Sequence, residues 1–361
     1  MRVLIDATSV LLRSAGIKNY TYHWIKYLRR LGGAEIEAFP FLGDLGELNH
    51  EGSVISQLAT YPRLALLYFV NIPGNPAMDW LTSGVDVFHI SNQVREPPKN
   101  TRLTATIFDL TCRIVPEFHT HGNLKADRSF TDRVLRRAHG LIAISENSKT
   151  DAVRLLGLDP ERIQVIHPGI PEQYFGASAT PRPKPYVLYV GAIEPRKNLD
   201  RLLDAWHLLR PSLREEFDLV VAGATGWGAT RTVQRLEAGI SGIQYLRYVP
   251  ERDLPGLTAG ATVFVYPSLY EGFGFPVAQA MACGVPVITS NNSCLPEIAG
   301  PGGIFVDPRS PVEIAAAIER LLTSPSLRDE LGSKGTVYAQ RYRWDLCAQQ
   351  SLEFFGRVCG L

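Results

Sequence analysis

The chain has 361 residues, a length typical of two or three domains. Its 37 basic and 36 acidic side chains give a formal net charge of +1, which argues against nucleic-acid binding by bulk electrostatics. Hydrophobic residues make up 45% of the chain, enough for ordinary cores and too many for a disordered protein. No stretch reaches the roughly 18 apolar residues of a membrane span, and the N-terminus does not have the pattern of a secretory signal.

The cysteines are odd in number and lack the short paired spacing of a zinc site or a disulfide framework. Their positions favour a reducing, cytoplasmic setting; they are Cys112, Cys283, Cys294, Cys347 and Cys359.

In the first half, apolar β-rich runs alternate with helical patterns, which predicts parallel α/β layers. The expected strands are Val3–Asp6, Ile36–Phe41, Val85–Ile90, Leu103–Phe108, Leu141–Ile144 and Gln164–His167. The expected helices are Lys18–Arg30, Arg128–Ala138 and Ser148–Leu156, the last with Ser145 as its N-cap. The apolar run Leu64–Val70 is interpreted as buried core, and docking of a lipid acceptor is the alternative.

Residues 170–185 interrupt this alternation with four prolines, which remove backbone donors and prevent a packed helix or central strand. We therefore predict an N-terminal domain over 1–172, a linker over 173–185, a C-terminal domain over 186–341 and a terminal helix over 342–361. A long surface loop within one domain is the alternative. Two α/β halves imply a cleft between them, and ligands of such sheets bind at the carboxyl ends of the strands.

A second alternating series follows the prolines. Its expected strands are Tyr186–Val190, Leu219–Ala222, Gln244–Val249, Val263–Pro267, Val287–Ser290 and Ile304–Val306. Its expected helices are Leu199–Leu209, Pro276–Cys283 and Val312–Leu322, and further helices follow Ser324, including Trp344–Val358.

The segment from Pro267 to Ser290 predicts an anion site. A buried strand leads into a loop with two glycines, Gly272 and Gly274, and a helix begins near Phe275. Glycines let a ligand approach the backbone, and a helix start offers N–H groups at the positive end of the helix dipole. Phosphate is the most plausible ligand, and a tight turn with no ligand is the alternative.

The same segment resembles the C-terminal signature of glycosyltransferase family four, the retaining enzymes of the GT-B fold that use nucleotide-sugar donors. Glu271 matches the first glutamate of the family's motif, and Ala280–Gly284 match its closing residues. The resemblance implies that Glu271 contacts hydroxyls of the donor sugar. The second glutamate, which contacts the ribose in the family, is replaced by Gln279, whose amide oxygen accepts a hydrogen bond without charge assistance. Weaker or altered nucleotide binding is therefore expected.

Val190–Leu199 is similar to a second family motif, a glycine followed by Arg-Lys-Asn. The resemblance implies that Arg196 and Lys197 bind the donor diphosphate and stabilise the charge that develops as it leaves. Asp109 follows Phe108, which stands where many relatives have histidine. Asp109 is expected either to orient the donor sugar or acceptor hydroxyl, or to be a turn residue.

These motifs give a set of candidate site residues. The expected catalytic residues are Glu271, Arg196, Lys197 and Asp109, with no metal ligands. The expected donor-binding residues are Gly16, Gly191, Gly272, Phe273, Gly274, Phe275, Pro276 and Gln279.

The resemblance implies a GT-B fold of two Rossmann-like, doubly wound parallel-sheet domains. The N-terminal domain would bind the acceptor, the C-terminal domain would bind the nucleotide sugar, and the terminal helix would cross back to the N-terminal domain. The implied activity is metal-independent, retaining transfer of a hexose from a nucleoside-diphosphate sugar to a glycan, lipid-linked or small-molecule acceptor. Polysaccharide or glycoconjugate biosynthesis is the implied pathway. The protein would need no cofactor beyond the donor substrate, and it would be cytoplasmic, with peripheral association at the cytoplasmic membrane face as a further expectation.

Two alternatives remain open at this point: a nucleotide-sugar epimerase of the same fold, and a non-catalytic nucleotide-sugar-binding relative. A dehydrogenase is not expected, because Gly223–Gly228 lacks the dinucleotide-binding spacing. His119 and His121 are interpreted as surface or acceptor-site residues rather than metal ligands. The arginines of a basic helix are expected to form a solvated face, with contact to an anionic membrane surface or lipid-diphosphate acceptor as the alternative; they are Arg128, Arg133, Arg136 and Arg137.

Overall fold

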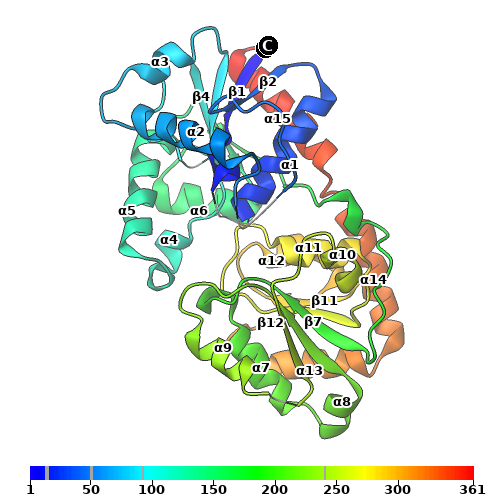
Figure 1. Ribbon diagram of the computed structural model, residues 1–361. Coiled ribbons are helices and arrows are strands. Elements are labelled where there is room, and N and C mark those ends of the chain that lie inside the picture. The colour runs from blue at the N-terminus through cyan, green and yellow to red at the C-terminus, as the bar shows by residue number, and fades with distance from the viewer. Residues whose placement is uncertain (13–15, 49–51, 92, 240) are drawn as a thin grey trace. The chain divides into compact units, whose positions relative to one another are not determined.

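The computed structural model describes residues 1–12, 16–48, 52–91, 93–239 and 241–361, and the chain divides into two compact units. The first unit comprises Met1–Gly169 together with Tyr342–Leu361, and the second comprises Ile170–Arg341. Each unit is a parallel sheet with helices on both faces (Figure 1). Residues 173–185 belong to the second unit, where Tyr174 is buried and the Thr180 N–H donates to the Gly256 carbonyl over 2.9 Å.

In the described part of the first unit, six strands form one parallel sheet in the order β2-β1-β3-β4-β5-β6. The strands are β1 (Arg2–Asp6), β2 (Glu35–Phe39), β3 (Val87–Ile90), β4 (Arg102–Ile107), β5 (Gly140–Ala143) and β6 (Ile163–Val165). The helices are α1 (Gly16–Leu31), α2 (Gln57–Val70), α3 (Ala77–Leu81), α4 (Thr111–Ile114), α5 (His121–Phe130), α6 (Glu146–Leu156) and α15 (Trp344–Cys359). The central strands are apolar and buried on both faces, as expected when helices cover both sides of a sheet.

The C-terminal helix α15 packs against α1 in the first unit, and Figure 1 shows the two helices side by side. The buried Trp24 indole N–H donates to the Ser351 hydroxyl over 2.9 Å, and Trp24 also packs against Phe355. Gly169 lies so close to Trp344 that a Cβ there would approach the Trp344 backbone nitrogen to 2.3 Å. A side chain at position 169 would therefore clash with the first residue of α15, which explains the glycine at this position.

In the described part of the second unit, six strands form one parallel sheet in the order β12-β11-β10-β7-β8-β9. The strands are β7 (Tyr186–Val190), β8 (Asp218–Ala222), β9 (Ile243–Arg247), β10 (Val263–Tyr266), β11 (Val287–Ser290) and β12 (Gly303–Val306). The helices are α7 (Leu199–Leu208), α8 (Pro211–Glu216), α9 (Thr230–Glu237), α10 (Leu254–Ala259), α11 (Phe275–Ala282), α12 (Leu295–Ala299), α13 (Pro311–Leu322) and α14 (Pro325–Ala339).

The predicted strands are confirmed in both units, most of them to within two residues at each end. Ser145 caps α6 as predicted, because its side chain accepts a hydrogen bond from the Ser148 N–H. The basic helix begins earlier than predicted, at His121, and passes through a π-helical turn over Thr131–Leu135.

The interpretation of Leu64–Val70 as buried core holds for one face only, where Val70 is buried and Leu66 and Leu67 pack against the core. This run is the second half of α2, in which Thr60 and Val70 are the buried residues, whereas Tyr68 and Phe69 are 79% and 51% exposed. An uninterrupted apolar run does not show which side of a helix faces solvent, and here aromatic side chains occupy the outer face. Among the described helices, none has the length and apolar character needed to cross a bilayer.

Candidate functional site

Three loops of the second unit meet at one edge of its sheet. Strand β10 lies between β7 and β11, and all three run parallel, so their carboxyl ends are neighbours. The loop after β7 carries Arg196 and Lys197, the loop after β10 carries Glu271, and the loop after β11 carries Ser293. This edge is where open α/β sheets bind ligands.

The Glu271 carboxylate is the centre of this arrangement. Its side chain is 9% exposed, and Oε1 accepts hydrogen bonds from Lys197 Nζ at 2.5 Å, from the Ser268 hydroxyl at 2.7 Å and from the Tyr266 hydroxyl at 3.0 Å. Arg196 pairs with the other oxygen, Oε2, at 3.1 Å. The structure thus brings three of the four expected catalytic residues into direct contact.

These contacts determine the charge state of the cluster. Burial alone would raise the pKa of Glu271, but the charges of Arg196 and Lys197 and the hydrogen bonds from Lys197 and Ser268 lower it to about 2. The pKa of Lys197 is lowered, because burial and the neighbouring Arg196 outweigh the attraction of Glu271. Glu271 is therefore ionised at neutral pH, and its charge opposes the lowering of the Lys197 pKa by burial.

Arg196 is held in place from both loops. Its guanidinium donates to the Tyr270 carbonyl at 2.5 Å and to Glu194 Oε1 at 2.9 Å. The Leu269 N–H donates to the Arg196 carbonyl over 2.8 Å, which ties the loop after β10 to the loop after β7. The side chain is 17% exposed, so the guanidinium is largely desolvated.

Asn198 fixes the turn that carries the two cations. It adopts a left-handed conformation (φ 59°), which asparagine tolerates better than most residues. Its amide donates to the carbonyls of Pro267 at 2.9 Å and Pro308 at 2.7 Å. The Arg-Lys-Asn motif thus consists of two cations and a residue that anchors their turn.

The glycines of the loop after β10 allow close packing at the start of α11. Gly274 has φ 85°, and a Cβ there would come within 2.8 Å of the Leu295 side chain. Gly272 and Phe273 are buried, and the Phe273 and Phe275 rings pack edge to face with centroids 5.0 Å apart.

The start of α11 offers fewer donors than the sequence suggests. Pro276 has no N–H, and the N–H groups of Val277 and Ala278 both donate to the Gly274 carbonyl. Of the first four helical residues, all within the described chain, only Phe275 has an N–H without a backbone partner. An anion at this helix start would therefore be held by the Phe275 N–H, the helix dipole and the neighbouring cations rather than by several amides.

A polar group without a partner lies beside Gly191. The Tyr189 hydroxyl is buried and makes no hydrogen bond to any described residue, and a Cβ at Gly191 would lie 3.3 Å from it. A Cβ at Gly223 would approach the Gly191 carbonyl to 1.9 Å. Sequence reasoning identified Gly191 but missed this hydroxyl.

Gln279 lies on α11 one turn after Phe275 and is half-buried. Within the described residues, its side-chain amide has no hydrogen-bond partner. The amide is therefore available to a ligand, and its role at the ribose stays a prediction.

Asp109 and Gly16 belong to the first unit. Asp109 Oδ1 accepts from the Thr111 N–H at 3.0 Å and from the Thr111 hydroxyl at 2.6 Å, which is the turn role expected as one alternative. Gly16 is exposed at the first residue of α1, and residues 13–15 before it lie outside the described chain. A role for either residue at the donor or acceptor stays a prediction. In the described residues, no group of three or more His, Cys, Asp or Glu side chains is arranged to hold a metal ion.

Sequence reasoning missed the polar side chains that complete the Glu271 cluster. Tyr266 is the last residue of β10, and Ser268 follows two residues later. The Ser293 hydroxyl accepts a hydrogen bond from the Glu271 backbone N–H over 3.3 Å. Their positions at strand ends are the signal that could have identified them, because polar residues there face the ligand edge of the sheet.

The two parallel-sheet units define a GT-B fold. The structure superposes on sucrose-phosphate synthase from Thermosynechococcus elongatus with a TM-score of 0.76 at 20% identity, covering 99% of this chain and 98% of the other. It superposes on Anabaena Alr3699/HepE in complex with UDP-glucose with a TM-score of 0.71 at 18% identity, covering 98% of each chain.

The sequence comparisons give the family. Residues 172–337 match the model of glycosyl transferases group 1, and residues 14–174 match that of glycosyltransferase family 4. O-antigen chain mannosyltransferase B of Escherichia coli is 30% identical over 98% of this chain and 99% of its own length. The chain therefore belongs to the group 1, family 4 glycosyltransferases, as its motifs predicted.

Proposed function

We propose that this glycosyltransferase moves a hexose, with mannose as the first choice, from a nucleoside-diphosphate sugar to a glycan acceptor in polysaccharide biosynthesis. The observation that carries the proposal is the buried cluster of Arg196, Lys197 and Glu271 at the ligand edge of the second sheet. The choice of mannose and of a polysaccharide acceptor is supported by similarity to the O-antigen chain mannosyltransferase over nearly the full length of both chains.

In this proposal, the two cations bind the donor diphosphate. As the glycosidic bond breaks, its electron pair passes to the diphosphate oxygen, and Arg196 and Lys197 stabilise the charge that develops there. A guanidinium and an ammonium that are already desolvated and hydrogen-bonded need little reorganisation when that charge appears. The Phe275 N–H and the positive end of α11 add to the same field.

Glu271 orients the donor sugar through one particular oxygen. Oε1 already accepts from three donors, whereas Oε2 has Arg196 as its partner. A carboxylate oxygen that has one donor retains capacity for a second. We therefore assign a sugar hydroxyl to Oε2, so that one carboxylate both positions the sugar and holds the two cations.

The stereochemical and chemical details extend the same proposal. Transfer retains the anomeric configuration, the departing diphosphate helps to accept the acceptor proton, and no metal ion or further cofactor is required. A lipid-linked glycan is the acceptor we favour, and it is the reason to propose that a cytoplasmic protein associates peripherally with a membrane.

The test is a donor panel with measurement of both the released nucleoside diphosphate and the glycosylated product. Arg196→Ala and Lys197→Ala are expected to lower kcat/KM at least 100-fold, because each removes charge stabilisation in the transition state. Arg196→Lys is expected to recover part of the rate by keeping the charge. The matched control is Arg201→Ala, which removes a half-exposed cation from α7 in the same unit.

The result that contradicts the proposal is an unchanged rate in folded Arg196→Ala and Lys197→Ala proteins. Epimerised nucleotide sugar without release of diphosphate would identify an epimerase instead. Donor binding without either product would identify a non-catalytic binder.

A further inference from the structure

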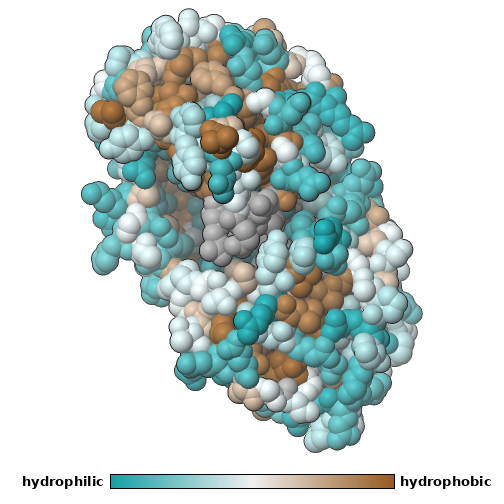
Figure 2. All heavy atoms as spheres, in the orientation of Figure 1, coloured by the Kyte–Doolittle hydropathy of each residue, from teal (hydrophilic) through white to brown (hydrophobic). Residues whose placement is uncertain are grey.

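The outer face of α2 in the first unit is an aromatic and aliphatic surface. Exposed hydrophobic side chains recur at helical spacing along this face and just beyond its end. They are Leu58 (89% exposed), Tyr61 (68%) and Tyr68 (79%) on α2, and Ile72 (44%) just after it. Trp80 on α3 is 78% exposed. Figure 2 shows hydrophobic residues gathered over this part of the first unit. The inner face of α2 packs on the core through Leu66 and Leu67. The side chains on its outer face therefore do not contribute to the core.

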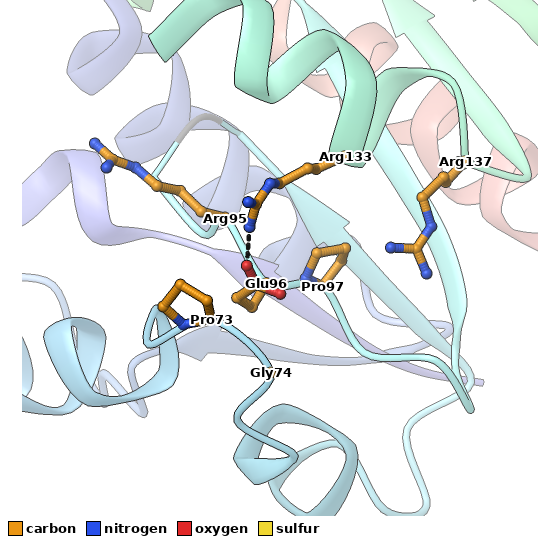
Figure 3. A pocket seen from close by; sticks show the side chains of 7 residues that line it. All are labelled: Pro73, Gly74, Arg95, Glu96, Pro97, Arg133 and Arg137. Atoms are coloured by element: carbon orange, nitrogen blue, oxygen red, sulfur yellow. Dashed lines mark hydrogen bonds and ion pairs between the residues drawn. The ribbon is translucent and has the colours of Figure 1, made fainter. Parts of the chain in front are cut away.

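A basic pocket lies where α2 ends. It has a volume of about 300 Å³ and is lined by Pro73, Gly74, Arg95, Glu96, Pro97, Arg133 and Arg137. Figure 3 shows Arg95 and Arg137 on opposite sides of the ion pair between Arg133 and Glu96. In the described chain, the guanidinium groups of Arg95 and Arg137 have no ion-pair or hydrogen-bond partner. Three arginines and one glutamate leave the lining with a net charge of +2.

We propose that the outer face of α2 and α3 and this arginine pocket together attach the protein to a bilayer of anionic phospholipids. The apolar side chains would enter the interfacial region, and the pocket would take a lipid phosphate through Arg95 and Arg137. This inference deepens the proposed peripheral association by assigning it to a surface and a lipid class.

The composition of the surface favours a bilayer over another occupant. Tyrosine and tryptophan combine an apolar ring with a polar atom and are enriched where membranes meet water. Helix α2 has no acidic residue, and the one carboxylate of α3, that of Asp79, accepts a hydrogen bond from the Lys99 N–H. Arginine is the side chain best suited to bind phosphate through several N–H groups. A second copy packed on the same face by a two-fold axis would instead place two pockets of charge +2 near each other, which is unfavourable.

The experiment measures binding of the full chain to vesicles, without donor or acceptor. We expect binding to vesicles that contain phosphatidylglycerol and little binding to pure phosphatidylcholine. Arg95→Gln with Arg137→Gln is expected to weaken binding to the anionic vesicles about 30-fold, because each arginine near such a surface contributes about fivefold. Leu58→Ser with Tyr68→Ser is expected to weaken binding to a similar or greater extent.

Two controls keep the result specific. Val337→Ser and Arg252→Gln remove an exposed apolar side chain and an exposed cation from the second unit, and they are expected to leave vesicle binding unchanged. Brominated lipids are expected to quench the fluorescence of the unmodified protein and to quench that of Trp80→Phe less. This readout places α3 at the bilayer without relying on a variant of α2.

Several outcomes would overturn the inference. One is equal binding of the protein to both vesicle types. Another is binding of the α2 and pocket variants to anionic vesicles as tight as that of the unmodified protein. A third is a concentration-dependent dimer that the α2 variant abolishes. Binding of free glycerol 3-phosphate by the pocket with no effect of Arg95→Gln and Arg137→Gln on vesicle binding would also overturn it. The transfer rate with a water-soluble acceptor is expected to be unchanged in the α2 and pocket variants, so failure of this inference is distinguishable from failure of the proposed reaction.

Discussion

Glu271→Gln tests the electrostatic reading of the site without removing the side chain. The substitution keeps the size of the group and an oxygen that accepts hydrogen bonds, but it removes the negative charge that faces Lys197 and Arg196 at 2.5 and 3.1 Å. The difference between the Glu271 pKa of about 2 and its ordinary value near 4.5 corresponds to about 3 kcal/mol of folding stability at neutral pH. Removing one partner from a buried ion pair gives a cost of the same order. We expect the free energy of unfolding to fall by about 3 kcal/mol.

The sign with respect to pH follows from the depressed pKa. The folded protein keeps Glu271 ionised to lower pH than the unfolded chain does, so its stabilising contribution is complete above about pH 4.5 and is lost as the pH falls toward 2. The free energy of unfolding of Glu271→Gln is therefore expected to fall less between pH 4.5 and pH 2 than that of the unmodified protein. Lys197→Met added to Glu271→Gln is expected to recover part of the stability, because it removes the buried ammonium left without its main counter-charge.

Urea unfolding at a series of pH values, followed by circular dichroism, measures these effects. The matched control is Glu330→Gln, which removes the charge of an exposed pair with Lys334 in the same unit and is expected to have no measurable effect. The electrostatic reasoning is refuted if Glu271→Gln unfolds like the Glu330→Gln control across the whole pH range.

Two further predictions concern other residues. His89 is buried between the hydroxyls of Thr104 and Thr106, and burial lowers its pKa to about 3, so the unfolded chain takes up a proton below pH 6.5 that the folded chain does not. Stability is therefore expected to fall by about 2 kcal/mol between pH 7 and pH 5, and His89→Gln should lose this pH dependence in denaturant titrations. Gln279→Glu is expected to lower KM for the donor about fivefold by adding charge assistance to a ribose hydrogen bond; steady-state kinetics showing neither KM nor kcat changed would remove Gln279 from the ribose contact.

The sequence predicted the strands and the main site residues because these depend on local patterns. Buried parallel strands are short apolar runs, and Gly272, Gly274 and Pro276 mark the loop and helix start directly. The family motifs supplied Arg196, Lys197 and Glu271. These patterns do not contain the information that Lys197 and Glu271, 74 residues apart, form a hydrogen bond.

What sequence reasoning missed depends on which side of an element faces the core. Leu64–Val70 has the hydrophobicity of a buried segment, but the sheet beneath α2 can cover only one face of it. The sequence also does not show which amides are free at the start of α11, where the Gly274 carbonyl accepts from the Val277 and Ala278 N–H groups. Both features arise from three-dimensional packing and not from residue type.

The charge balance of the site in the second unit adds an electrostatic role to the one proposed for Glu271 at the donor sugar. Arg196 and Lys197 are matched by Glu194 and Glu271, so the four side chains carry no net charge before a donor binds. Burial and Arg196 lower the pKa of Lys197, whereas Glu271 raises it, so Glu271 favours the ammonium form that the proposed charge stabilisation needs. In the proposed reaction, a bound diphosphate would add its negative charge to that of Glu194 and Glu271 and would raise the pKa of Lys197. We therefore predict that Glu271 supports the ammonium form of Lys197 before the donor binds, and that a bound donor would share the two cations with Glu271.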